Sequence, residues 1–115
     1  MIFGAGNIGS TLAARLHKEH ITDICIVRSS GIFDMQGNKI TEQQDWKSFV
    51  TDTDVAFICI PTVEKGDQAF EYEMEFLNHG KPVISCEKAS IAYHWDELKK
   101  YKDIFKYNAS VGGRT

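Results

Sequence analysis

Hydrophobic residues in this chain form short continuous runs that alternate with stretches of helical spacing. Apolar runs rich in β-formers predict buried strands at 2–3, 23–28, 55–60, 82–86 and 104–109. Between them, apolar residues recur every three or four positions over 8–16, 67–77 and 93–102, as on one face of a helix. Strands that alternate with helices from end to end predict an α/β fold, a doubly wound parallel sheet with helices over both faces.

Capping and turn signals refine the ends of these elements. Thr41 and Gln44 have the spacing of a capping box and predict a short helix that begins there. Asp67 is expected to cap the helix that follows it, and Gly80 to end that helix. The Gly-Asn pair within 35–39 predicts the tip of a small hairpin or loop.

Composition narrows the classes of function. With 115 residues, 43% of them hydrophobic, the chain is expected to form one domain, residues 1–115. A formal net charge of -3 argues against nucleic acid as a partner. No apolar run is long enough to span a membrane and no signal peptide is apparent, so a cytoplasmic location is expected. Cys25, Cys59 and Cys86 are interpreted as buried, reduced thiols, and no metal site is predicted.

The stretch "FGAGNIGS" places glycines at positions 4, 6 and 9, between a predicted strand and a predicted helix. This G-x-G-x-x-G spacing suits a dinucleotide. Gly4 permits the tight turn, Gly6 lets a pyrophosphate approach the backbone, and Gly9 lets the helix pack close to the strand. Asn7 and Ile8 lie within the motif and are counted among the candidate cofactor-binding residues. Only three residues precede Gly4, which is a short strand for the centre of a sheet.

The residues after the second predicted strand bear on the choice of dinucleotide. An acidic residue at that position would bind the ribose hydroxyls of NAD. Here the position holds Arg28, followed by Ser29, and a guanidinium beside a hydroxyl suits the 2′-phosphate of NADP. NADP is therefore the predicted cofactor, with NAD as the alternative if Arg28 only stacks on adenine or faces solvent. Asp34 is a fallback acid that lies six residues too late.

Ligands of such sheets bind at the carboxyl ends of the strands. Pro61 and Thr62 follow the third predicted strand, Lys88 follows the fourth, and Gly112 follows the last. These residues are expected to surround the nicotinamide. Glu87 is interpreted as a possible surface ion partner of Lys88.

Four stretches together resemble the nucleotide-binding domain of the homoserine dehydrogenase family: "FGAGNIGS", "RSSG", "VISCEKASIA" and "NASVGG". The resemblance implies a Rossmann-type NAD(P)-binding fold and an oxidoreductase of amino-acid biosynthesis that interconverts L-aspartate 4-semialdehyde and L-homoserine. It implies that Lys88 takes part in proton transfer to the carbonyl oxygen, that Gly112 lies beside the nicotinamide, and that a homodimer is possible.

The chain also departs from that family. Glu87 stands where the family commonly has Asn, and Arg114 and Thr115 replace a small residue and proline. Family members continue into a substrate domain, so the chain is expected to be a fragment that is inactive by itself. The alternative hypothesis is a stand-alone NAD(P)-binding sensor or regulatory module, for which neither Lys88 nor the "SVGG" segment has an evident use.

Overall fold

The computed structural model describes residues 1–4, 14–16, 18–19, 24–60 and 64–107. The strands are β1 (Ile2–Phe3), β2 (Ile26–Arg28), β3 (Gly31–Phe33), β4 (Lys39–Thr41), β5 (Ala56–Ile58), β6 (Val83–Ser85) and β7 (Phe105–Tyr107). The helices are η1 (Gln43–Phe49), η2 (Glu64–Gly66), α2 (Asp67–Asn78), α3 (Lys88–Leu98) and η3 (Lys99–Tyr101). Residues 14–16 and 18 are also helical.

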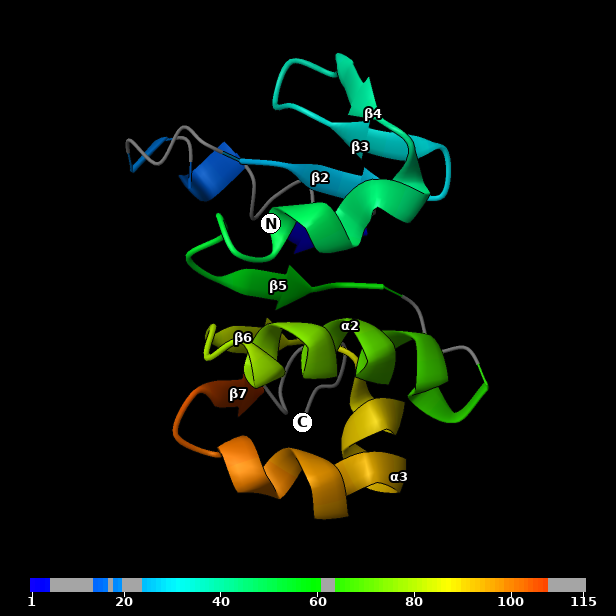
Figure 1. Cartoon of the computed structure of the whole chain (residues 1–115), viewed down its shortest axis with the longest axis vertical. Coiled ribbons are helices and arrows are strands. Elements are labelled where there is room, and N and C mark those ends of the chain that lie inside the picture. Colours follow the sequence, from blue (N-terminus) through cyan, green and yellow to red (C-terminus); the bar gives the residue numbers. More distant parts are fainter. Residues whose placement is uncertain (5–13, 17, 20–23, 61–63, 108–115) are drawn as a thin grey trace.

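All the strands belong to one sheet in the order β4-β3-β2-β1-β5-β6-β7 (Figure 1). β2, β1, β5, β6 and β7 pair in parallel, which confirms the predicted doubly wound α/β fold. β3 and β4 were not predicted as strands, and they pair antiparallel at one edge. Only Ser29 and Ser30 separate β2 from β3, and so short a connection cannot make a parallel crossover.

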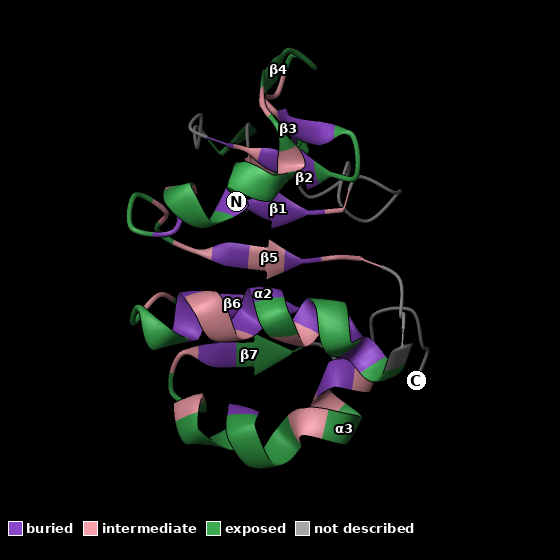
Figure 2. Cartoon of the chain, turned by 45° about the vertical axis from the view of Figure 1, so that its right-hand side comes forward, coloured by how far each residue is buried: buried purple, intermediate pink, exposed green. Residues whose placement is uncertain are grey.

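Both faces of the sheet are covered. One face packs against η1 and α2 through a buried cluster that includes Phe3, Val27, Trp46, Ile58, Tyr72 and Phe76. The opposite face carries Ile2, Ile26 and Phe57, against which Leu16 of the first helical segment packs. Figure 2 shows burial concentrated along the central strands, while edge strand β7 is largely exposed. None of the helices in the described part of the chain is long and apolar enough to cross a membrane.

The two-residue strand β1 does occupy the centre of the sheet. Its Phe3 ring lies 4.2 Å from the ring of Tyr72 and contacts Trp46 and Phe76 edge-on. The amine of Met1 donates a hydrogen bond of 3.0 Å to the carbonyl of Val55, beyond the strand itself. Aromatic packing from η1 and α2 therefore compensates for the few ladder hydrogen bonds that so short a strand can make.

Several predicted helix boundaries are wrong. Glu42, not Thr41, precedes the first turn of η1, and the Thr41 hydroxyl donates to the Asp45 side chain instead of capping the helix. Gly66 rather than Asp67 is the N-cap of α2. α2 ends at Asn78, and Gly80 terminates it as predicted. The left-handed backbone of Gly80 lets Gly80 and Lys81 donate to the carbonyls of the last helical turn.

Helix α3 begins at Lys88, five residues before the predicted start. Glu87 supplies the reason, because its side chain accepts a hydrogen bond of 2.7 Å from the backbone N–H of Ser90 and so caps the first turn. Apolar spacing locates the buried face of a helix but not its first turn, which this polar contact fixes.

Candidate functional site

The order of the strands reverses between β1 and β5, because the chain builds the sheet outward from β1 in one direction and from β5 in the other. Gly4 follows β1 at this switch point with a φ of +98°. A Cβ on Gly4 would lie 2.6 Å from the carbonyl oxygen of Cys59, which follows β5. Both the backbone conformation and the close approach therefore require glycine, as predicted for the tight turn. Ligands of doubly wound sheets bind in the crevice that opens at such a point.

Arg28 ends β2, the neighbour of β1 on one side of the switch point. Its side chain is exposed, and the guanidinium carbon lies 5.2 Å from the centre of the Phe33 ring. Among the described residues it makes no ion pair, and Ser29 beside it is exposed as well. Stacking on Phe33 orients the guanidinium and leaves its N–H groups available to an anion.

Lys88 lies on the other side of the switch point, at the carboxyl end of β6. Its side chain is exposed at the first position of α3. The helix dipole makes a positive charge unfavourable at the N-terminus of a helix. Lys88 therefore does not stabilise α3 through its charge. β2 and β6 are separated by three strand spacings, about 14 Å. Arg28 and Lys88 therefore lie on opposite sides of the switch point rather than close together.

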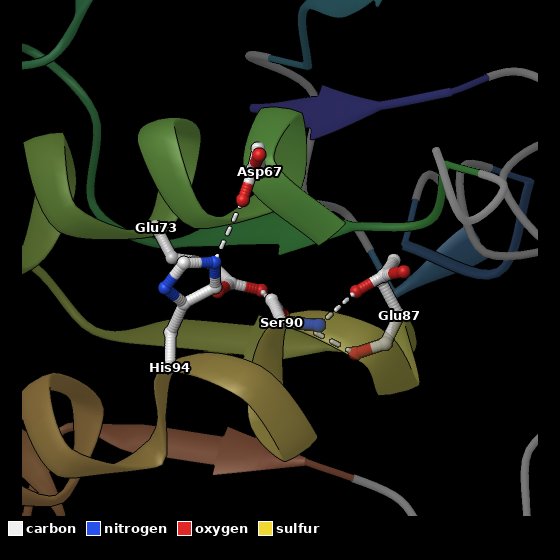
Figure 3. A network of polar contacts seen from close by, with 5 residues as sticks. All are labelled: Asp67, Glu73, Glu87, Ser90 and His94. Atoms are coloured by element: carbon white, nitrogen blue, oxygen red, sulfur yellow. Dashed lines mark hydrogen bonds and ion pairs between the residues drawn. The ribbon is translucent and has the colours of Figure 1, made fainter. Parts of the chain in front are cut away.

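Glu87 is not the surface ion partner that the sequence suggested. It is 2% exposed and turns inward to cap α3. Figure 3 shows it within a buried network with Glu73 of α2 and Ser90 of α3. One carboxylate oxygen of Glu73 accepts hydrogen bonds from the hydroxyls of Ser85, at 2.7 Å, and Ser90, at 3.1 Å. The network therefore ties the chain on both sides of Lys88 to α2.

Burial dominates the electrostatics of this network. Glu73 is fully inaccessible, and its second carboxylate oxygen has no hydrogen-bond partner within the part of the chain that the structure describes. Desolvation raises the pKa of Glu73 to about 8; its hydrogen bonds from Ser85 and Ser90 oppose this rise, and the nearby Glu87 adds to it. Glu73 is therefore largely protonated at neutral pH.

A second contact, which the sequence did not predict, joins the starts of α2 and α3. Gly66 has a φ of +77°, and a Cβ there would lie 2.2 Å from the backbone nitrogen of Ser90. His94 of α3 also contacts α2. One ring nitrogen of His94 lies 2.8 Å from a carboxylate oxygen of Asp67 (Figure 3). The His94 ring stacks on the ring of Phe70, with 4.0 Å between the ring centres. The only signal in the sequence was a glycine immediately before a predicted helix.

The three cysteines are free thiols, but each is half-buried rather than buried as predicted. Cys59 and Cys86 directly follow β5 and β6, and their sulfur atoms lie 4.0 Å apart. Cys25 lies at the opposite edge of the sheet, just before β2. Sequence spacing alone could not pair Cys59 with Cys86, because the pairing depends on the register of two strands.

Several predicted site residues lie outside the described residues. They are Gly6, Asn7, Ile8, Gly9, Pro61, Thr62 and Gly112. Of the predicted set, the structure therefore places Gly4, Arg28, Ser29 and Lys88, all of them at the carboxyl edge of the sheet.

A hollow of about 480 Å³ lies at the other edge, where the strands begin. Met1, Cys25, Asp54 and Val55 are among the residues that line it. Its position at the amino ends of the strands separates it from the crevice at the switch point, so it is not the site that this fold uses for a dinucleotide.

Residues 1–111 match the family model GFO_IDH_MocA, described as "oxidoreductase family, NAD-binding Rossmann fold". The chain belongs to this family. The expected Rossmann-type fold and an oxidoreductase NAD(P)-binding domain are thereby confirmed. No curated protein sequence matches the chain.

A solved structure shows the same fold: a hyperthermophilic archaeal homoserine dehydrogenase in complex with NADPH. It superposes with a TM-score of 0.72 at 20% sequence identity. The match covers 95% of this chain and 43% of the archaeal chain, so this domain spans less than half the length of that enzyme. The resemblance noted in the sequence is therefore supported at the level of the fold.

Proposed function

We propose that residues 1–115 form the NADP-binding domain of an oxidoreductase similar to homoserine dehydrogenase. The observation that carries this proposal is the exposed Arg28 at the end of β2, whose guanidinium makes no ion pair among the described residues. At this position an NAD-binding domain would carry an acid. The NADPH bound to the archaeal structure of the same fold supports the preference.

Each of the predicted residues at the carboxyl edge of the sheet has a separate proposed role. Gly4 keeps the switch point open for the backbone turn. Arg28 and Ser29 would hold the 2′-phosphate through charge-assisted hydrogen bonds. Lys88, on the far side, would stand at the nicotinamide end. Gly6, Asn7, Ile8, Gly9, Pro61, Thr62 and Gly112 complete the proposed cofactor-binding set.

In the proposed reaction a reduced nicotinamide, when bound, supplies hydride to a carbonyl carbon. Lys88 would donate a proton to the carbonyl oxygen as negative charge develops there. On the basis of the resemblance to homoserine dehydrogenase, we propose aspartate 4-semialdehyde as the substrate. The remaining parts of the proposed enzyme are a substrate domain and a second subunit. By itself the domain is expected to bind cofactor without turnover.

Titration calorimetry of the chain with NADPH and with NADH tests the cofactor assignment. NADPH is expected to bind more tightly, and Arg28→Ala to weaken NADPH binding by about tenfold to a hundredfold, the effect of losing a charge-assisted hydrogen bond. The variant should leave NADH affinity nearly unchanged. Lys102→Ala removes the same charge from an exposed position before β7 and serves as the matched control. Tighter binding of NADH, or equal losses in the two variants, would contradict the assignment.

A separate prediction concerns Lys88 in the enzyme that includes its substrate domain. Lys88→Ala is expected to lower kcat by about a hundredfold to ten-thousandfold, the range for a general acid. NADPH affinity should change little. Lys99→Ala, an exposed lysine just after α3, is the control for charge. Normal kcat in the Lys88 variant would remove this residue from the mechanism.

A further inference from the structure

Cys59 and Cys86 occupy equivalent positions on neighbouring parallel strands. Each lies one residue beyond the paired Ile58 of β5 and Ser85 of β6. The ladder continues past that pair, because the backbone N–H of Cys86 donates to the carbonyl of Ile58 at 2.8 Å. Neighbouring strands are about 4.8 Å apart, which is within the separation of roughly 4.4 to 6.8 Å that a disulfide needs between Cα atoms.

The sulfur atoms already face each other at 4.0 Å, with the Cys59 thiol donating a hydrogen bond to the Cys86 sulfur. This hydrogen bond stabilises the Cys86 thiolate and lowers the pKa of Cys86 to about 7. The same hydrogen bond, together with burial, raises the pKa of Cys59. The two thiols are therefore unequal, with one nucleophile and one neighbour that keeps its proton.

We propose that Cys59 and Cys86 form a peroxide-sensitive dithiol that closes reversibly to a disulfide at the carboxyl edge of the sheet. Two half-buried thiols from adjacent strands, in register and 4.0 Å apart, carry this inference. Cys25 is not part of this pair, because it lies at the opposite, amino edge of the sheet.

The oxidation proceeds in two balanced steps. The Cys86 thiolate attacks one oxygen of hydrogen peroxide, the O–O bond breaks, and the departing hydroxide takes a proton to become water. The Cys59 sulfur then attacks the sulfur of the resulting Cys86 sulfenic acid and loses its proton. The S–O bond breaks, and the hydroxyl takes up a proton and leaves as a second water. Two thiols are oxidised to one disulfide, and one peroxide is reduced to two waters.

This dithiol adjoins the crevice of the proposed cofactor. The carbonyl of Cys59 lies against Gly4 at the switch point, as the 2.6 Å approach to a Cβ on Gly4 shows. A disulfide would fix the ends of β5 and β6 at the place where a dinucleotide enters. Protection of the thiols by NADPH is therefore expected, and this consequence alone rests on the proposed function.

Mass spectrometry of the 115-residue chain after treatment with equimolar hydrogen peroxide tests the dithiol. The chain is expected to lose the mass of two hydrogen atoms, and dithiothreitol should restore them. Trypsin separates the cysteines into peptides 19–28, 48–65 and 66–88, so the cross-link should join 48–65 to 66–88. At pH 7, iodoacetamide should label Cys86 at least about tenfold faster than Cys59.

Three variants make the test specific. Cys25→Ser should form the disulfide as readily as the parent chain. Cys59→Ser should stop at a sulfenic acid on Cys86, which dimedone traps, whereas Cys86→Ser should give no such adduct on Cys59. A cross-link that involves Cys25, or a parent chain that forms only over-oxidised or intermolecular products, would overturn the proposal.

Addition of NADPH separates this inference from the proposed function. Slower disulfide formation with NADPH supports both. A disulfide that forms at the same rate with saturating NADPH contradicts the placement of the cofactor but leaves the dithiol intact. Absence of the disulfide in a chain that binds NADPH overturns the dithiol and leaves the cofactor assignment standing.

Discussion

Gly66→Ala is expected to lower the free energy of unfolding by several kcal/mol, a large share of the roughly 5–15 kcal/mol that is typical of a domain. A Cβ at this position would lie 2.2 Å from the backbone nitrogen and 2.7 Å from the Cα of Ser90, and 2.8 Å from the carbonyl carbon of Ala89. These atoms are backbone, so only a shift of α3 away from α2 could relieve the overlap. The φ of +77° adds strain for any residue with a side chain.

Gly80→Ala is the matched control for that variant. Gly80 has a similar φ of +72°, but a Cβ there would meet no atom within 4 Å. Its replacement should cost only the left-handed strain, about 1–2 kcal/mol. Urea unfolding followed by far-UV circular dichroism measures both. Equal losses in the two variants would mean that strain, rather than the contact with Ser90, is what requires glycine at position 66.

Glu73→Gln is expected to change how stability depends on pH. An unfolded glutamate titrates near 4.5, whereas burial raises the pKa of folded Glu73 to about 8. Between these values the folded state binds more protons than the unfolded state, so the free energy of unfolding falls as pH rises. The contribution of Glu73 is complete below pH 4.5 and lost above about pH 8, with a slope of at most about 1.4 kcal/mol per pH unit.

Glutamine has nearly the same shape as a protonated glutamate and does not titrate. The variant should therefore gain stability relative to the parent chain from pH 4.5 to pH 8, by a few kcal/mol in total, while the hydrogen bonds from Ser85 and Ser90 can persist. Glu71→Gln removes an exposed carboxyl from the same helix and is the control. Urea titrations at several pH values in this range give the free energy of unfolding of each variant as a function of pH. Parallel curves for the two variants would exclude a buried, protonated Glu73.

The sequence predicts those features of the carboxyl edge of the sheet that depend on a single segment of the chain. The continuous apolar runs locate the buried parallel strands, because a strand covered on both faces must be apolar throughout. Gly4 is assigned correctly, since its φ and its place after β1 follow from one local motif. Arg28 at the end of β2 is likewise placed by counting from the glycines.

Contacts between segments could not be predicted in this way. Glu87 appears in the sequence as one more acidic surface residue, and only the packing of α2 against β6 and α3 places it in a buried network with Glu73. The Gly-Asn pair predicted the turn between β3 and β4, but not the two strands, because they are short and partly exposed and neither shows a clear apolar run.

The amino-acid sequence by itself thus determined the class of fold, the switch-point glycine and the arginine at the end of β2, because each depends on residues close together in the chain. Tertiary structure alone decided the partners of Gly66, Glu73 and Cys86, which lie on other segments. The physical reason is strand register and helix packing. They bring together atoms from different segments to within 4 Å, and no spacing along the chain encodes that proximity.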